Sequence, residues 1–209
     1  MPRRFFLFCH RVPPDGTFSL NDLAGSGGRL DEIARVVNST FIVSNGIRRD
    51  CFLDLWLVRD LPRARRIQLS GARLKYLNPD ERSTSALLRN ALIRSWDRPG
   101  ETLEITPGIW AGPLDLDGAL ETWGRGPNPI WLQERGTLLR RSDLPDDLGV
   151  LLSDPYDLTT EEVRRVEGFP HQKISLGPVS LPSSHCIVLL HNELDLRTPE
   201  GRPSEAPPG

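Results

Sequence analysis

The chain has 209 residues, of which 38% are hydrophobic, and it carries a formal net charge of −2 with a pI near 6.1. That length suits one large domain with a hydrophobic core. The net charge is not the strongly positive one that by itself indicates a nucleic-acid-binding protein. All but two of the 26 cations are arginines, a residue that suits bidentate phosphate contacts. Biased codon usage is the simpler explanation of this excess.

The first half predicts strands and helices in alternation. Residues 3–12 predict a first strand, and 51–58 a second with 66–69 as its candidate neighbour. Two helices are expected, over 29–43 and over 81–96. The first has apolar side chains at helical spacing, and the second follows Asp80, a residue type favoured at the N-cap. Residues 97–108 are predicted as a loop.

The second half repeats the alternation more regularly. A short helix is expected over 113–123, and the apolar runs 129–133 and 149–154 are typical of buried strands of a parallel sheet. Thr159 and Glu162 form a capping-box pattern at the start of a helix. A strand over 173–176 and a last helix over 183–194 complete the pattern, and the polar, proline-rich tail 198–209 is expected to be disordered.

Strands that alternate with helices imply βαβ units, a parallel sheet and an α/β fold. Ligands of such sheets collect at the carboxyl ends of the strands. Here those ends are Leu151–Asp154 and Ile174–Pro178. The segment after the second strand, 176–182, is small, apolar and uncharged, which suits close contact with a ligand.

Several motifs fail on inspection. The "GSGG" at 25–28 lacks the GK[ST] of a phosphate loop, so a flexible approach to a helix is the better interpretation. Three cysteines, Cys9, Cys51 and Cys186, are far apart and predict neither disulfides nor a zinc site. The histidines and the missing GxSxG element do not favour a nucleophilic triad. No apolar run is long enough for a signal peptide or a membrane span, so we expect a cytoplasmic protein with no metal and no membrane partner.

Two charged clusters remain open to two interpretations. Arg48, Arg49 and Asp50 precede a strand, and Arg29 and Asp31 stand at a helix start. Charges at element ends are commonly solvated and have no further role. The same residue types could also form a polar pocket, with arginine for phosphates and a carboxylate for a base.

Four blocks in one order carry a resemblance over nearly the whole chain: "LNDLAGSGGRLDEIARVVNSTFIVSNGIRRD", "LNPDERSTSALLRNAL", "TPGIW" and "KISLGPVSLPSSHCIVLLHNELD". Together they resemble the archaeal tRNA pseudouridine-54 N1-methyltransferase family, of the SPOUT class of S-adenosylmethionine (SAM) enzymes. The blocks "NPDERST" and "HNELD" are the most specific.

The resemblance implies an α/β domain over 1–197 with a SPOUT-type parallel sheet. A deep C-terminal trefoil knot would span roughly 129–195, bind SAM and contribute to a homodimer interface. By match to the family pattern, SAM would contact Leu132, Ser153, Leu176, Gly177, Pro178, Val179, Ser180, Leu181 and Cys186. Cys186 is expected as a wall of the pocket, because methyl transfer from SAM needs no covalent enzyme intermediate.

The implied reaction is methyl transfer from SAM to N1 of pseudouridine at position 54 of tRNA. Asp31 and Asp50 are the candidate acceptors of the N1 proton, and Arg29, Arg48 and Arg49 the candidate RNA contacts. One alternative keeps the chemistry but moves it to rRNA or to another tRNA position. Another is a non-catalytic knotted RNA-binding protein, which the change from Gly-Asp-His in many relatives to Ser153-Asp154-Pro155 would favour.

Overall fold

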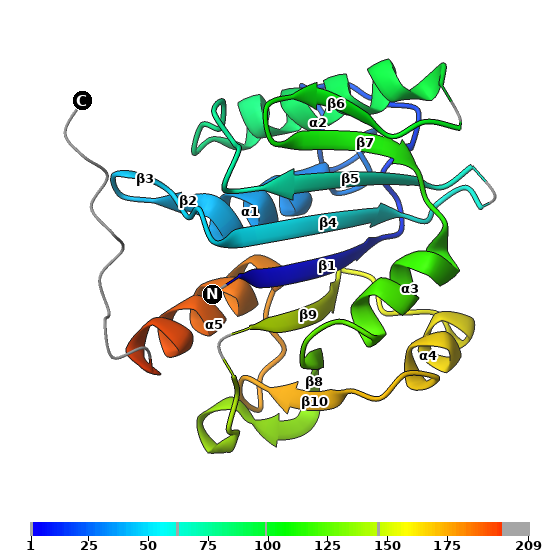
Figure 1. The fold of residues 1–209 in the computed structure, drawn as a ribbon. Helices are drawn as coiled ribbons and strands as arrows, with labels where there is room; N and C mark the ends of the chain where they lie inside the picture. Colours follow the sequence, from blue (N-terminus) through cyan, green and yellow to red (C-terminus); the bar gives the residue numbers. More distant parts are fainter. Residues whose placement is uncertain (1, 62, 99, 146, 198–209) are drawn as a thin grey trace.

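The computed structural model describes residues 2–61, 63–98, 100–145 and 147–197, which form an α/β domain built on an eight-stranded sheet (Figure 1). The strands of this sheet are β1 (Arg3–Cys9), β4 (Cys51–Leu57), β5 (Arg65–Ser70), β6 (Leu103–Thr106), β7 (Ile109–Pro113), β8 (Pro129–Leu138), β9 (Leu148–Ser153) and β10 (Gln172–Ser175). A two-stranded hairpin is formed by β2 (Ile42–Val43) and β3 (Gly46–Ile47). The helices are α1 (Leu30–Phe41), α2 (Glu81–Trp96), α3 (Leu116–Gly124), α4 (Thr160–Glu167) and α5 (Ser183–Arg197), with a 3-10 turn η1 at Leu139–Arg141.

The strand order is β10-β8-β9-β1-β4-β5-β7-β6, and the sheet changes character at β4. From β10 to β4 every neighbouring pair is parallel, whereas β5, β7 and β6 join by antiparallel pairs. The parallel half confirms the prediction for the strands near 129–133, 149–154 and 173–176. The sheet as a whole is mixed, because β5, β6 and β7 each run antiparallel to their neighbours.

Helices cover both faces of the sheet, as Figure 1 shows. One core layer packs α1, α2 and α5 against alternate residues of the strands, including Phe5 and Leu7 of β1. The other layer packs α3 and α4 against the intervening residues, including Phe6 and Phe8. Strand β1 is therefore buried on both faces, which explains its continuous apolar run. Among the described helices, none has the length and apolar character that a membrane span requires.

The predicted loop over 97–108 is wrong in part, because it contains β6 and leads directly into β7. These strands lie at the edge of the sheet and pair with each other through a register irregularity at Glu104 and Thr106. Short edge strands carry weak sequence patterns, and proline and glycine at 107–108 dominate the local signal. The predicted helix starts fare better: Asp80 accepts from Ser83 N, and Thr159 and Glu162 form the complete capping box.

A buried ion pair joins β4 and β5. The Asp54 side chain is fully buried, and it accepts bonds from Nε of Arg66 at 2.8 and 2.9 Å and from the Nη2 nitrogen of the same guanidinium. Burial raises the pKa of Asp54, and the hydrogen bonds from Arg66 oppose that rise. The hydrogen bonds from Arg66 therefore offset the cost of burying the Asp54 carboxylate.

Replacing Arg66 by methionine should destabilise the domain by about 3 kcal/mol, because it leaves a buried carboxylate without its cation. Urea unfolding followed by tryptophan fluorescence would measure the loss. The double variant Asp54→Leu with Arg66→Met removes both charges and should recover most of it. A double variant no more stable than Arg66→Met alone would contradict this account.

Candidate functional site

A cavity of about 500 Å³ lies at the carboxyl ends of the parallel strands, within the size range of small-molecule sites. Its walls come from the middle of β8, from the ends of β9 and β10 with the turn that follows β9, and from the first turns of α1, α4 and α5. The structure brings together around it these residues of the predicted cofactor set: Leu132, Ser153, Leu176, Gly177, Val179, Ser180, Leu181 and Cys186. Pro178, within the same loop, is not among the lining residues.

The loop between β10 and α5 forms one wall of the cavity. Gly177 has φ 152°, a conformation that favours glycine, and the Ser175 hydroxyl both donates to Gly177 O at 3.0 Å and accepts from its N–H at 3.2 Å. The Ser183 hydroxyl donates to Ser153 O at 2.5 Å and ties the start of α5 to the end of β9. Apolar side chains and backbone polar groups thus meet in a wall that carries no charge.

Cys186 lies on the cavity as a neutral thiol. Burial, followed by the negative charge of Glu134, raises its pKa to about 11. A thiol with such a pKa is a poor nucleophile near neutral pH. The geometry therefore agrees with a wall residue at this position.

The opposite wall holds a network of arginines and carboxylates at the start of α1. Arg29 has a left-handed backbone, with φ 68°, and donates to both oxygens of Asp31 at 3.1 Å and to Glu32 at 2.9 Å. Arg35 also donates to Asp31, at 2.7 Å. Arg29 and Glu32 line the cavity, whereas Asp31 lies behind Arg29 and is not a lining residue.

Asp31 is held as a carboxylate by this network. Burial would raise its pKa, but the hydrogen bonds from Arg29 and Arg35 outweigh burial and lower it. A depressed pKa makes a weak proton acceptor, since general bases work best with a pKa near the operating pH. In this conformation Asp31 orients Arg29 through their ion pair. Its role as a proton acceptor stays a prediction.

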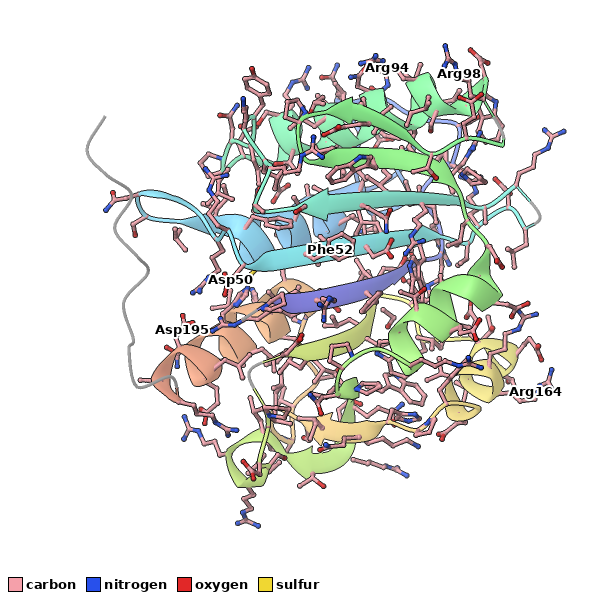
Figure 2. All side chains as sticks on the ribbon, viewed as in Figure 1. Asp50, Phe52, Arg94, Arg98, Arg164 and Asp195 are labelled. Carbon is pink, nitrogen blue, oxygen red and sulfur yellow. The ribbon has the colours of Figure 1, made fainter. Side chains whose placement is uncertain are left out.

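The remaining predicted residues lie at the other end of the sheet. Arg48 pairs with Asp195 at 2.6 Å, Arg49 donates to the carbonyls of Gly71 and Leu74, and the carbonyl of Asp50 accepts from Arg3 N. Figure 2 labels Asp50, directly before β4, and Asp195 of α5; Arg3 contacts the carbonyl of the first and the side chain of the second. The seven residues of β4 span about 20 Å, so within one chain these residues do not share a site with Arg29.

Asp154, directly after β9, lines the cavity and is held by a partner that no sequence pattern indicates. Its side chain has no exposed surface, and its two oxygens accept from His10 N at 2.6 Å and face His10 Nδ1 at 2.7 Å. The other ring nitrogen of His10 lies 3.2 Å from Glu162. His10 and Asp154 are 144 positions apart, so no local spacing links them.

Metal ligation has no candidate cluster here: within the described ranges, no group of three or more His, Cys, Asp or Glu side chains is arranged to hold an ion. The cavity is lined by its apolar loop and by charged side chains from several elements, including Arg29, Glu32 and Glu134.

Comparison with known proteins identifies the family that the chain matches. Residues 2–198 match a family described as "Putative SAM-dependent RNA methyltransferase". The chain is 38% identical over 195 residues to a tRNA (pseudouridine(54)-N(1))-methyltransferase of Methanosarcina mazei, covering 92% of this chain and 90% of the relative. It is 34% identical over 194 residues to the corresponding protein of Haloferax volcanii, covering 92% and 96%.

The fold is shared with a solved structure. Archaeoglobus fulgidus Nep1 bound to S-adenosylhomocysteine aligns with a TM-score of 0.61 and 13% sequence identity, over 94% of this chain and 98% of Nep1. At that identity the likeness concerns the arrangement of helices and strands.

Within the "GSGG" segment Gly25 and Ser26 are exposed, whereas Gly28 packs closely against the backbone of Arg11 and needs to be glycine. Its φ is 61°, and a Cβ atom there would lie 2.0 Å from the carbonyl oxygen of Arg11. Gly28→Ala should therefore destabilise the domain by about 2 kcal/mol or more, since the left-handed backbone alone costs roughly 1–2 kcal/mol for alanine. Thermal unfolding would measure this effect.

Gly46→Ala is the matched control, because a Cβ atom at Gly46 meets no atom within 4 Å. It should change stability by no more than about 0.5 kcal/mol. Equal melting temperatures for the two variants would show that the packing against Arg11 does not constrain this turn.

Proposed function

Because the chain belongs to the family of SAM-dependent RNA methyltransferases that includes the tRNA (pseudouridine(54)-N(1))-methyltransferases, we propose that it methylates N1 of pseudouridine at position 54 in tRNA, with SAM as the methyl donor. The observation that carries the proposal is the 38% identity to the Methanosarcina mazei enzyme across 92% of this chain. The cavity at the strand ends supplies the place for the reaction.

The residues of the cavity fit SAM in size and chemistry. Leu132, Leu176 and Leu181 offer apolar surface for the two faces of an adenine ring, and the backbone of 176–181 offers donors and acceptors for its edge. The carboxylates of Glu32 and Glu134 lie on the same cavity and suit the ammonium group of the cofactor's amino-acid end. When bound, SAM supplies an electrophilic methyl group on a positively charged sulfur.

The protein's contribution to this displacement is chiefly orientation. Holding N1 in line with the methyl carbon can supply roughly 7–11 kcal/mol of the barrier reduction in favourable cases. The target base has to leave its stack in the tRNA loop to enter the cavity. We propose that Arg29, at the edge of the cavity beside Glu32, contacts this base or its phosphate.

The N1 proton needs an acceptor, and Asp31 and Asp50 remain the proposed candidates. Asp31 is the nearer of the two, since Arg29 joins it to the cavity wall. Asp50, with Arg48 and Arg49, would need a second subunit to reach a reacting base, because β4 separates it from the cavity of its own chain.

We further propose the SPOUT arrangement in full, with one domain over 1–197 and a trefoil knot over about 129–195. The strand order is compatible with a knot, because β8 lies between β9 and β10, so the chain must cross β8 after β9 to place β10 on its other side. The expected disordered tail, 198–209, lies outside the described residues. A tRNA substrate would place the protein in the cytoplasm.

A homodimer through α5 is part of this proposal. Val188, Leu189 and Leu196 expose 52%, 42% and 74% of their surface, whereas Ile187 and Leu190 on the same helix are buried. A helix that is apolar on several sides is normally covered on several sides. The apolar side chains of Val179 and Leu181 at the cavity add to the exposed surface, which makes a second copy of the chain the fitting occupant.

The activity can be tested with labelled SAM and two matched tRNAs, one with pseudouridine and one with uridine at position 54. We expect label only in the first, because uridine is attached to ribose through N1 and has no N–H there. Label in neither tRNA while SAM still binds would move the proposal to rRNA or to another tRNA position. Absence of both labelling and SAM binding would favour a non-catalytic RNA-binding protein.

Leu189→Glu should convert a dimer into a monomer of 23.4 kDa, because it would bury a charge in an apolar interface. Sedimentation equilibrium would measure the mass. Ile93→Glu is the matched control, since Ile93 is a similarly exposed apolar residue, 45% exposed, on α2. A monomeric wild-type protein, or loss of the dimer in both variants, would exclude an interface centred on α5.

A further inference from the structure

His10 lies immediately after β1, in a position that connects three elements of the cavity wall. Its Nδ1 is 2.7 Å from Asp154, which follows β9, and its Nε2 is 3.2 Å from Glu162, in the first turn of α4. Its backbone N–H also donates to Asp154, at 2.6 Å. The imidazole is only 13% exposed and stacks on Phe8.

Both ring nitrogens face carboxylate oxygens, and carboxylates only accept. Two N–H donors are present only in the imidazolium form, because the neutral ring has one donor and one acceptor. Burial alone would lower the pKa of His10, but the hydrogen bonds and charges of Asp154 and Glu162 outweigh it and raise the pKa to about 9. The cation is therefore the form expected at neutral pH.

The two carboxylates hold segments that belong to the cavity. Asp154 lines the cavity and also accepts from Tyr156 N at 3.1 Å, so it shapes the turn that carries Ser153, Pro155 and Asp157 along the same wall. Glu162 accepts from the backbone N–H of Thr159 at 2.7 Å and closes the capping box of α4. Leu158 and Val163, on either side of that cap, line the cavity too.

We propose that His10 is a positioning residue for the cofactor cavity: its imidazolium, shared between Asp154 and Glu162, fixes the 153–158 wall in the shape that binds SAM. The inference rests on the proposed function, because it assigns the cavity to SAM. His10 itself is not a lining residue, so it acts through Asp154.

Among the described residues, four charged or titratable groups lie near His10: Asp154, Glu162, Arg11 and Cys9. Asp154 and Glu162 face the ring, and Arg11, the next residue, packs its guanidinium on the Tyr156 ring at 3.8 Å. Cys9, on the other side along the chain, is buried with a raised pKa, chiefly through burial and then through Asp154, and is neutral at pH 7. Folding raises the pKa of His10. The stabilisation from its ion pairs with Asp154 and Glu162 is therefore fully present below about pH 6.5 and is lost as the pH rises through about 9.

The test compares SAM binding by calorimetry for the wild type and His10→Gln. At pH 7 the variant should raise the Kd of SAM roughly tenfold, the loss expected for a charge-assisted hydrogen bond. The KM for SAM should rise with it, while kcat at saturating SAM and the KM for tRNA change little. The ratio of the two Kd values should fall toward one between pH 7 and pH 10, a comparison in which the titration of SAM itself cancels.

Glu161→Gln is the matched control, because Glu161 is next to Glu162 but pairs with Arg164 and Arg165 in solvent. It should bind SAM as the wild type does. Should His10→Gln fail to fold, Glu162→Gln gives the same test: with one carboxylate removed, the loss of SAM affinity at alkaline pH should begin at lower pH than in Glu161→Gln.

The outcomes separate this inference from the proposed function. Equal Kd values for the wild type and His10→Gln, or a Kd ratio that does not change with pH, would overturn the role of His10 and leave the methyltransferase proposal standing. An unchanged alkaline midpoint in Glu162→Gln would do the same. A wild-type protein that binds no SAM at pH 7 would overturn the proposed function itself.

Discussion

The parallel alignment of β1, β4 and β9 is the constraint on which the rest of the structure depends. Phe8 of β1 is in register with Trp56 of β4 and Ser153 of β9, so the segments after these strands emerge at one edge. That edge receives His10 and the turn after Ser153, which is why a cavity forms there. At the opposite edge the strands begin at an ion-pair cluster, in which Asp195 of α5 holds Arg3 and Arg48. Ion pairs therefore connect the elements at the amino ends of these strands, and the cavity lies at their carboxyl ends.

Charge is distributed around the cavity so that little of it is free. The 176–182 loop is uncharged, the imidazolium of His10 is divided between two carboxylates, and Arg29 is divided between Asp31 and Glu32. Such pairing holds each of these charged groups in a defined orientation. It also offsets part of the desolvation cost that Asp154 and Glu162 would carry if they were buried without a partner. The same arrangement suits a reaction in which a positive sulfonium becomes neutral, because a strong unpaired negative charge beside it would favour the reactant over the transition state.

The sequence predicts those parts of the fold whose signals are local. Buried runs identify β1, β4 and β9, and the caps at Asp80 and Thr159 locate two helix starts. Strand β7 pairs with β5, which lies far earlier in the chain, and the edge strand β6 pairs only with β7. The sequence patterns of both strands are too short to indicate them. At the cavity, family resemblance selects the loop 176–181, whereas the His10–Asp154 contact is purely tertiary. Arg48, Arg49 and Asp50 form a charged cluster in the sequence. In the structure Arg48 pairs with Asp195 and Arg49 donates to a backbone carbonyl, which are contacts common at element ends.

The network at the start of α1 bears on how the proton could leave N1. Asp31 has a lowered pKa because Arg29 and Arg35 both bind it, which makes it a weak acceptor. Arg29, however, is held at the cavity as a fixed cation. When N1 of pseudouridine loses its proton, the negative charge spreads onto the ring carbonyl oxygens, and a guanidinium placed near them stabilises that charge without having to reorganise. The proposed site therefore favours a mechanism in which the chain stabilises the anionic base through Arg29, and a weak acceptor such as Asp31 or solvent is sufficient to take the proton.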